Sequence, residues 1–245
     1  MPGWMDHVML FAIVLALPTW GAIRTALLLA SPQPERSRPA IYRAAIRTQW
    51  ALALAVLVVW MVPARPWGPL GLAGPATLPA LSASAWVLAG VALVLLLRAR
   101  AFGNAKALAA KRIRLRRTQG FMPRTSEELR AFLPLAVTAG VCEELVFRGF
   151  VTWYLQPIVG TVGAVAIAAA LFGLSHAHLG ARGVLFTAIV GAWLGGICIM
   201  TGSLYVAMAI HVLIDLQAGF FSTAAFAREQ QASGSGLPMH RIQII

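Results

Sequence analysis

Long apolar runs alternate with short polar or basic segments along most of this chain. A helix that crosses a lipid bilayer needs about 20 mainly apolar residues. Several runs reach that length, so the pattern predicts an all-α, polytopic transmembrane helix bundle with about seven spans. The predicted spans cover residues 5–29, 47–64, 79–97, 131–155, 160–178, 183–201 and 203–226.

The amino-acid composition favours the same fold class. Of the 245 residues, 59% are hydrophobic and 11% are charged, whereas roughly 25% of the residues of a soluble domain are charged. A soluble domain of this size could not bury so much apolar surface. We therefore expect lipid to solvate much of the protein.

Basic residues are concentrated in two segments between the apolar runs, although the whole chain carries a net charge of +12. Segments 31–47 and 98–130 hold most of them, whereas segment 65–78 holds only Arg65. Because positive residues accumulate on the cytoplasmic side of membrane proteins, both basic segments are predicted to be cytoplasmic and the N-terminus external. We expect the loop 98–130 to contact anionic lipid headgroups, and we expect no nucleic-acid partner, because membrane helices flank the loop.

These patterns divide the chain into four regions. We expect a membrane region of three helices, a basic cytoplasmic loop, a core of four helices and a flexible tail. Their ranges are 1–97, 98–130, 131–227 and 228–245.

The fourth predicted helix carries three ionisable residues, which cost free energy inside a bilayer unless they pair, line a cavity or act in chemistry. Glu144 and Arg148 are four residues apart, so they share a helix face and can form an ion pair. Glu143 is turned away from them by about 100°. One carboxylate therefore has no partner within its own helix.

Two later helices carry further polar pairs at the same spacing. His176 follows Phe172 by four residues, and Asp215 follows His211 by four. Small residues nearby would let the helices approach closely. Together with Glu143, these side chains supply a base, a partner for that base and an oxyanion donor, which are the requirements of water-mediated peptide hydrolysis. Their depths in the predicted spans match poorly, which requires displaced helix ends or tilted or broken helices.

The runs E-E-x-x-x-R-G, F-x-x-x-H and H-x-x-x-D occur in this order on successive apolar helices. Their order and spacing resemble the CAAX-protease and bacteriocin-processing family of intramembrane proteases, which includes the abortive infection proteins. The resemblance covers roughly residues 130–227. It implies proteolysis in a bacterial inner or plasma membrane, without a metal or another cofactor. The implied substrate is a membrane-embedded protein or peptide that is membrane-anchored or lipid-modified.

The resemblance also implies a role for each matched residue. Glu143 corresponds to the base that activates water, and His176 corresponds to its partner. His211 corresponds to a donor to the oxyanion or to the substrate carbonyl. Asp215 occupies a position where family members have Asn or Asp. Because an ionised Asp cannot donate a hydrogen bond, we expect Asp215 to orient His211.

Three further residues are expected to organise the site, and several alternatives stay open. Glu144 and Arg148 would act as a pair, with Phe172 packed beside them. The same polar residues could instead hold together a non-enzymatic scaffold or immunity protein, relay protons in a transporter or bind a metal. His178 competes with His176 for its role. Cys142 is expected to be a buried apolar residue rather than a nucleophile.

Overall fold

The computed structural model describes residues 2–29, 34–73, 78–101 and 121–234, and within these ranges it contains helices and turns but no strands. The prediction of an all-helical bundle is therefore confirmed. In chain order the elements are α1 (Trp4–Leu29), α2 (Pro34–Met61), the 3₁₀-helix η1 (Gly68–Leu70), α3 (Leu78–Ala101), α5 (Ser126–Glu144), the π-helix η2 (Leu145–Val151), α6 (Thr152–Ser175), the 3₁₀-helix η3 (Ala177–Leu179), α7 (Gly180–Thr201) and α8 (Leu204–Gly234).

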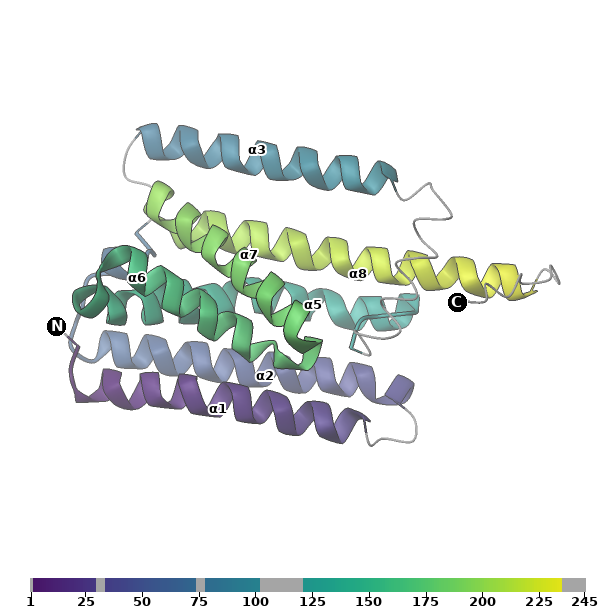
Figure 1. Ribbon diagram of the computed structural model, residues 1–245, viewed down its shortest axis with the longest axis horizontal. Coiled ribbons are helices and arrows are strands. Elements are labelled where there is room, and N and C mark those ends of the chain that lie inside the picture. Colours follow the sequence, from purple (N-terminus) through teal and green to yellow (C-terminus); the bar gives the residue numbers. More distant parts are fainter. Residues whose placement is uncertain (1, 30–33, 74–77, 102–120, 235–245) are drawn as a thin grey trace.

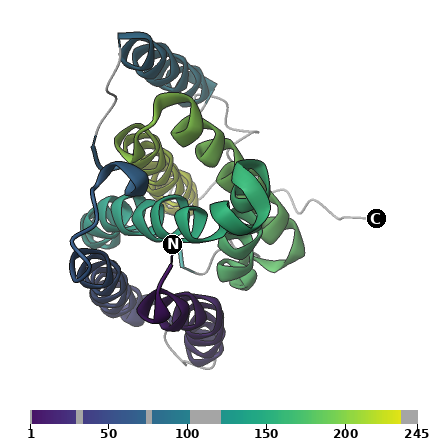
Figure 2. The same ribbon diagram turned by 90° about the vertical axis from the view of Figure 1, so that its left-hand side faces the viewer.

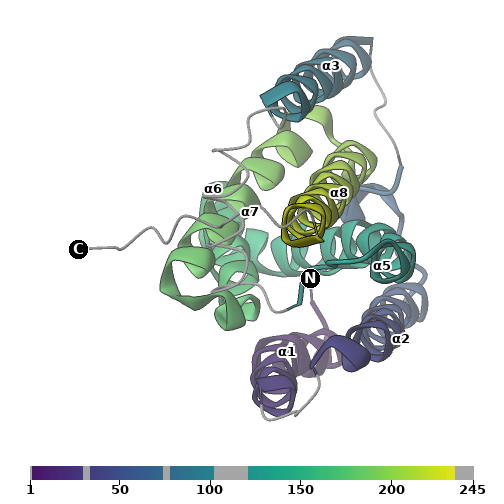
Figure 3. The same ribbon diagram turned by 90° about the vertical axis from the view of Figure 1, so that its right-hand side faces the viewer.

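Most of the long helices lie along one common direction, whereas α7 crosses them obliquely (Figure 1). Helices α1 and α2 form one side of the bundle, α3 lies on the opposite side, and the other helices fill the space between them (Figures 2 and 3). Helix α5 packs against both α2 and α8, and α6 packs against α7. Helix α5 therefore lies between α2 and α8, although the three helices are far apart in the sequence.

Four stretches of the described helices are long and apolar enough to cross a membrane, and two shorter helical stretches are also apolar. The longest stretch, Ser126–Ser175, contains Gly160 with φ of 73° and ψ of 171°. Glycine adopts this non-helical geometry without a steric penalty, and the helix is kinked there. These helices support an integral membrane protein, whereas the count of seven spans stays a prediction. The four long stretches are Arg38–Met61, Ser126–Ser175, Gly180–Thr201 and Leu204–Ala227, and the shorter ones are Trp4–Leu15 and Ser84–Val94.

Several predicted boundaries differ from the structure. Most of the predicted loop 31–47 is helical, because α2 begins at Pro34, a residue that fits the first helical turn. Helix α8 continues to Gly234, beyond the predicted start of the tail at residue 228. The central part of the basic loop, 102–120, and the end of the tail, 235–245, lie outside the described residues.

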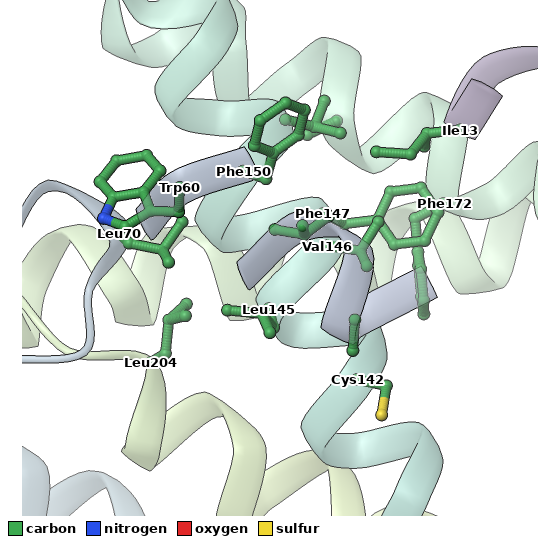
Figure 4. Packing of buried hydrophobic residues seen from close by; sticks show 14 of the residues in the cluster. Ile13, Trp60, Leu70, Cys142, Leu145, Val146, Phe147, Phe150, Phe172 and Leu204 are labelled. Carbon is green, nitrogen blue, oxygen red and sulfur yellow. The ribbon is translucent and has the colours of Figure 1, made fainter. Parts of the chain in front are cut away.

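Buried apolar side chains form clusters toward both ends of the bundle. One cluster joins α1, α2, α5, η2, α6 and the start of α8, and includes Trp60, Phe150 and Leu204 (Figure 4). A second cluster joins α2, α5 and α8 around Tyr42 and Phe132. The polar residues singled out in the sequence lie on helices that these clusters hold together.

Helices α5 and α8 approach closely at Gly140. A Cβ atom added to this glycine would lie 2.5 Å from Val212 Cγ2 and 2.8 Å from the Val212 backbone nitrogen. Because a backbone atom cannot move aside cheaply, we expect Gly140→Ala to destabilise the protein by about 1–3 kcal/mol. Thermal unfolding in detergent measures the effect.

The matched control is Gly196→Ala on α7. Among the described residues, no heavy atom outside the adjoining helix backbone lies within 4 Å of a Cβ added at Gly196, so we expect unfolding at or slightly above the temperature of the unsubstituted protein. Equal unfolding temperatures for Gly140→Ala and Gly196→Ala would contradict the close approach of α5 to α8.

Candidate active site

The start of α5 is capped, and a buried ion pair ties it to α2. Thr125 accepts a hydrogen bond from the Glu128 backbone N–H at 3.1 Å, as an N-cap residue does. Glu128 in turn accepts one from the Arg124 backbone N–H at 2.7 Å and one from Arg38 Nη1 at 2.7 Å. These bonds fix the rotation and depth of α5 relative to α2.

A π-helix follows directly after the two glutamates. Residues Leu145–Val151 make this wider turn, and all of them are buried. Single π-helical turns often occur at functional sites, because they change the phase of a helix. Here the turn carries Arg148, whose Nη1 lies 3.0 Å from Glu144 Oε1. The guanidinium also stacks on Phe172, with its central carbon 4.1 Å from the ring centre.

One imidazole, that of His211 on α8, lies between the two adjacent glutamates. Its Nδ1 is 2.7 Å from Glu144 Oε1, and its Nε2 is 3.9 Å from Glu143 Oε2. Because an ionised carboxylate only accepts hydrogen bonds, Nδ1 donates to Glu144. The two glutamates point in different directions, as their spacing predicts, yet they reach opposite sides of the same ring.

Asp215 faces the same imidazole from one helical turn further along α8. Its Oδ2 lies 3.8 Å from His211 Nε2, and its side chain is 31% exposed. We expected Asp215 to orient His211, but the carboxylate within hydrogen-bond distance of that ring is Glu144. The difference arises because the close approach of α5 to α8 brings Glu144 onto the ring, a contact that spacing within α8 cannot reveal.

His176 lies just beyond the end of α6. Its Nδ1 is 2.9 Å from the Phe172 carbonyl oxygen, so Nδ1 donates and Nε2 keeps its lone pair in the neutral ring. The Phe172 ring centre is 4.8 Å from that of His176 and 5.9 Å from that of His211. Phe172 therefore joins the two imidazoles through ring contacts. The side chain of His178 lies outside the described residues.

Gln49 on α2 is a site residue that the sequence analysis missed. Its Nε2 donates a hydrogen bond of 2.7 Å to Glu143 Oε1. The residue lies near the start of an apolar run, where a lone neutral amide gives little signal of function. Only the packing of α2 against α5 reveals the contact.

Both cysteines are free thiols, and the described residues contain no metal-binding group. Cys142 is buried in the apolar cluster next to Leu145 and Val146 (Figure 4), and both Cys142 and Cys198 are free thiols. In the part of the chain that the structure describes, no group of three or more His, Cys, Asp or Glu side chains is placed to hold a metal ion.

Comparison with known proteins gives one match. Residues 125–217 match the family model described as type II CAAX prenyl endopeptidase Rce1-like. No curated protein and no solved structure matches the chain. The matched segment begins at the cap of α5 and includes α5, η2, α6 and α7 and the first part of α8, but not α2. This match confirms the resemblance to the CAAX-protease family: the segment 125–217 of this integral membrane protein is similar to the Rce1-like type II CAAX prenyl endopeptidases.

Proposed function

We propose that this protein is an intramembrane endopeptidase in which Glu143 activates a water molecule to hydrolyse a peptide bond of a membrane-anchored or lipid-modified substrate. The observation that carries the proposal is the convergence of Glu143 and Asp215 on one nitrogen of His211, at 3.9 and 3.8 Å. The family match supports protease chemistry, and the geometry suggests a separate chemical role for each of these residues.

The gap between Glu143 Oε2 and His211 Nε2 suits a bridging water. At 3.9 Å the two atoms are too far apart for a direct hydrogen bond, whereas a polar separation of this size is commonly bridged by water. Glu143 Oε2 has no hydrogen-bond partner among the described residues. In the proposed reaction it takes a proton from the water, and the water oxygen attacks the scissile carbonyl carbon.

His211 is arranged to stabilise the charge that then develops on the carbonyl oxygen. Both of its ring nitrogens face carboxylates, so the ring is arranged to donate on both sides. Glu144 holds Nδ1 and leaves Nε2 directed at the reacting centre, where a donor to the oxyanion lowers the barrier. Glu143 next passes its proton to the leaving nitrogen, the C–N bond breaks, and a carboxylate and an amine are released.

His176 supplies the second side of the reacting centre. With Nδ1 held by the Phe172 carbonyl, its Nε2 can accept a hydrogen bond from the water or from the leaving amine. We propose this role as the partner of Glu143. The stacked contact between Phe172 and Arg148 keeps the two imidazoles and Glu144 in fixed positions relative to one another.

The surroundings of the site favour a substrate that reaches it through the membrane. Glu143 and His211 lie within stretches that are apolar enough to span a bilayer. Large apolar side chains are exposed on the outside of the same bundle, including Val137, Val162 and Met200. A peptide anchored by a prenyl group or a membrane helix would enter such a site without leaving the lipid.

Cleavage of a prenylated peptide by the full chain in proteoliposomes tests the proposal. We expect hydrolysis that persists after treatment with a zinc chelator and in Cys142→Ala, because neither a metal nor the thiol takes part. Activity that is lost on chelation and restored by zinc would support the metal alternative instead. Loss in a folded Cys142→Ala protein would indicate a nucleophilic thiol. Proton flux without cleavage would identify a transporter, and neither activity would favour a scaffold or immunity protein.

A further inference from the structure

Gln49 contacts Glu143, which is the general base in the proposed function. Gln49 itself lies outside the segment that matches the protease family. Its Nε2 is 2.7 Å from Glu143 Oε1. We infer that Gln49 is a positioning residue that holds one oxygen of Glu143 and thereby directs the other toward the reacting water. The inference rests on the proposed function and extends the site to the N-terminal region of the chain.

The two oxygens of Glu143 have different environments. Oε1 accepts the amide hydrogen bond from Gln49, whereas Oε2 faces His211 Nε2 at 3.9 Å. A carboxylate rotates about its terminal bond within a broad torsional well. A donor on Oε1 removes this freedom and keeps Oε2 on the side of His211. A base that must take a proton from one direction requires this difference between its two oxygens.

Helix α2 holds Gln49 in a fixed place. On one side of it along α2, Arg38 pairs with Glu128 at 2.7 Å and the Tyr42 hydroxyl donates to the Phe121 carbonyl at 2.6 Å. On the other side, Ala53 and Val56 are fully buried in the first apolar cluster. Contacts before and after Gln49 thus limit both the rotation of α2 and its sliding against α5.

The residue type at this position also fits the role. A lysine or an arginine there would form an ion pair with Glu143 and weaken it as a base, and a second carboxylate would repel it. A neutral amide donates one directional hydrogen bond and adds no charge. Gln49 can therefore orient the base without neutralising it.

The test measures steady-state cleavage of the prenylated peptide by full-length Gln49→Met and Gln49→Asn in proteoliposomes. Methionine keeps the length of the side chain and removes the donor, whereas asparagine keeps the amide but is too short to reach Glu143. We expect kcat to fall by about 10- to 100-fold in both variants, with KM within about two-fold, because a slightly misplaced base slows the chemical step. If one of the two variants does not fold, measurements on the other are sufficient for the test.

A second readout does not depend on activity. Infrared difference spectra of protein labelled with ¹³C-glutamate give the carboxylate band of Glu143, assigned by its loss in Glu143→Gln. We expect both Gln49 variants to shift this band. Gln156→Met is the matched control, because Gln156 is an exposed amide that donates to Thr161 at 3.0 Å on α6. It should leave the band unchanged and kcat within about two-fold.

The outcomes separate this inference from the proposed function. A shifted band together with a lower kcat and an unchanged KM supports the positioning role. An unshifted band, or a shifted band with unchanged kcat, overturns that role while Glu143 remains the base. Full activity of Glu143→Gln would overturn the proposed function itself, and the positioning role with it.

Discussion

Glu143→Gln is expected to lower kcat for the prenylated peptide by about 10²- to 10⁴-fold, the usual contribution of a general base. Glutamine has nearly the shape of glutamate, but its amide cannot take a proton from water. KM should change little, because the substrate-binding surface is preserved. Single-turnover cleavage in proteoliposomes measures the chemical step directly.

The fold should survive this substitution. Glu143 shares its surroundings with the carboxylates of Glu144 and Asp215, which lie 2.7 and 3.8 Å from the His211 ring. Removing one of three like charges relieves repulsion, so the unfolding temperature should be equal to or above that of the unsubstituted protein. Glu127→Gln, an exposed change in the first turn of the same helix, is the control and should retain full activity. Activity within ten-fold of the original in Glu143→Gln would rule out this residue as the base.

The second large effect is expected from Glu144→Gln, which acts on both activity and stability. Glu144 accepts from His211 Nδ1 at 2.7 Å and pairs with Arg148 at 3.0 Å, and both charged side chains are almost fully buried. Without its carboxylate, His211 loses the partner that holds its orientation, and such a loss can lower kcat by about 10⁴-fold in catalytic triads. The buried arginine also loses its counter-charge, which costs about 3–5 kcal/mol.

The double variant Glu144→Gln with Arg148→Met separates these two effects. Replacing both members of a buried ion pair is often neutral for stability, whereas removing only one is costly. We therefore expect the unfolding temperature to recover in the double variant while cleavage stays low, because His211 still lacks its orienting carboxylate. Recovery of cleavage together with stability would show that Glu144 serves only to balance the charge of Arg148.

Much of the candidate site can be read from local spacing. Glu144 and Arg148 form the ion pair that their four-residue separation predicts, even though a π-helix begins between them. His211 and Asp215 face each other for the same reason. Such pairs are local properties of a helix, so they can be recognised before any tertiary contact is known. Their chemical roles remain proposals.

Contacts between helices could not be predicted in this way. Glu143 and His211 lie 3.9 Å apart in the structure, although their predicted depths match poorly. Helix α6 is kinked at Gly160, and it ends at Ser175, just before His176. The depth of a side chain depends on where its helix breaks, and a hydropathy pattern locates such breaks only to within several residues.

The sequence by itself determined the class of protein: apolar runs too long and too numerous for a soluble core, with a few ionisable residues inside them. Tertiary structure alone decided which of these residues meet. It placed Gln49 on Glu143, and it made Glu144 rather than Asp215 the close partner of His211. The physical reason is that burial of apolar surface requires only a pattern, whereas a hydrogen bond of 2.7 Å requires the rotation and depth of two helices to agree. That agreement comes from the Gly140 contact and the Arg38–Glu128 ion pair.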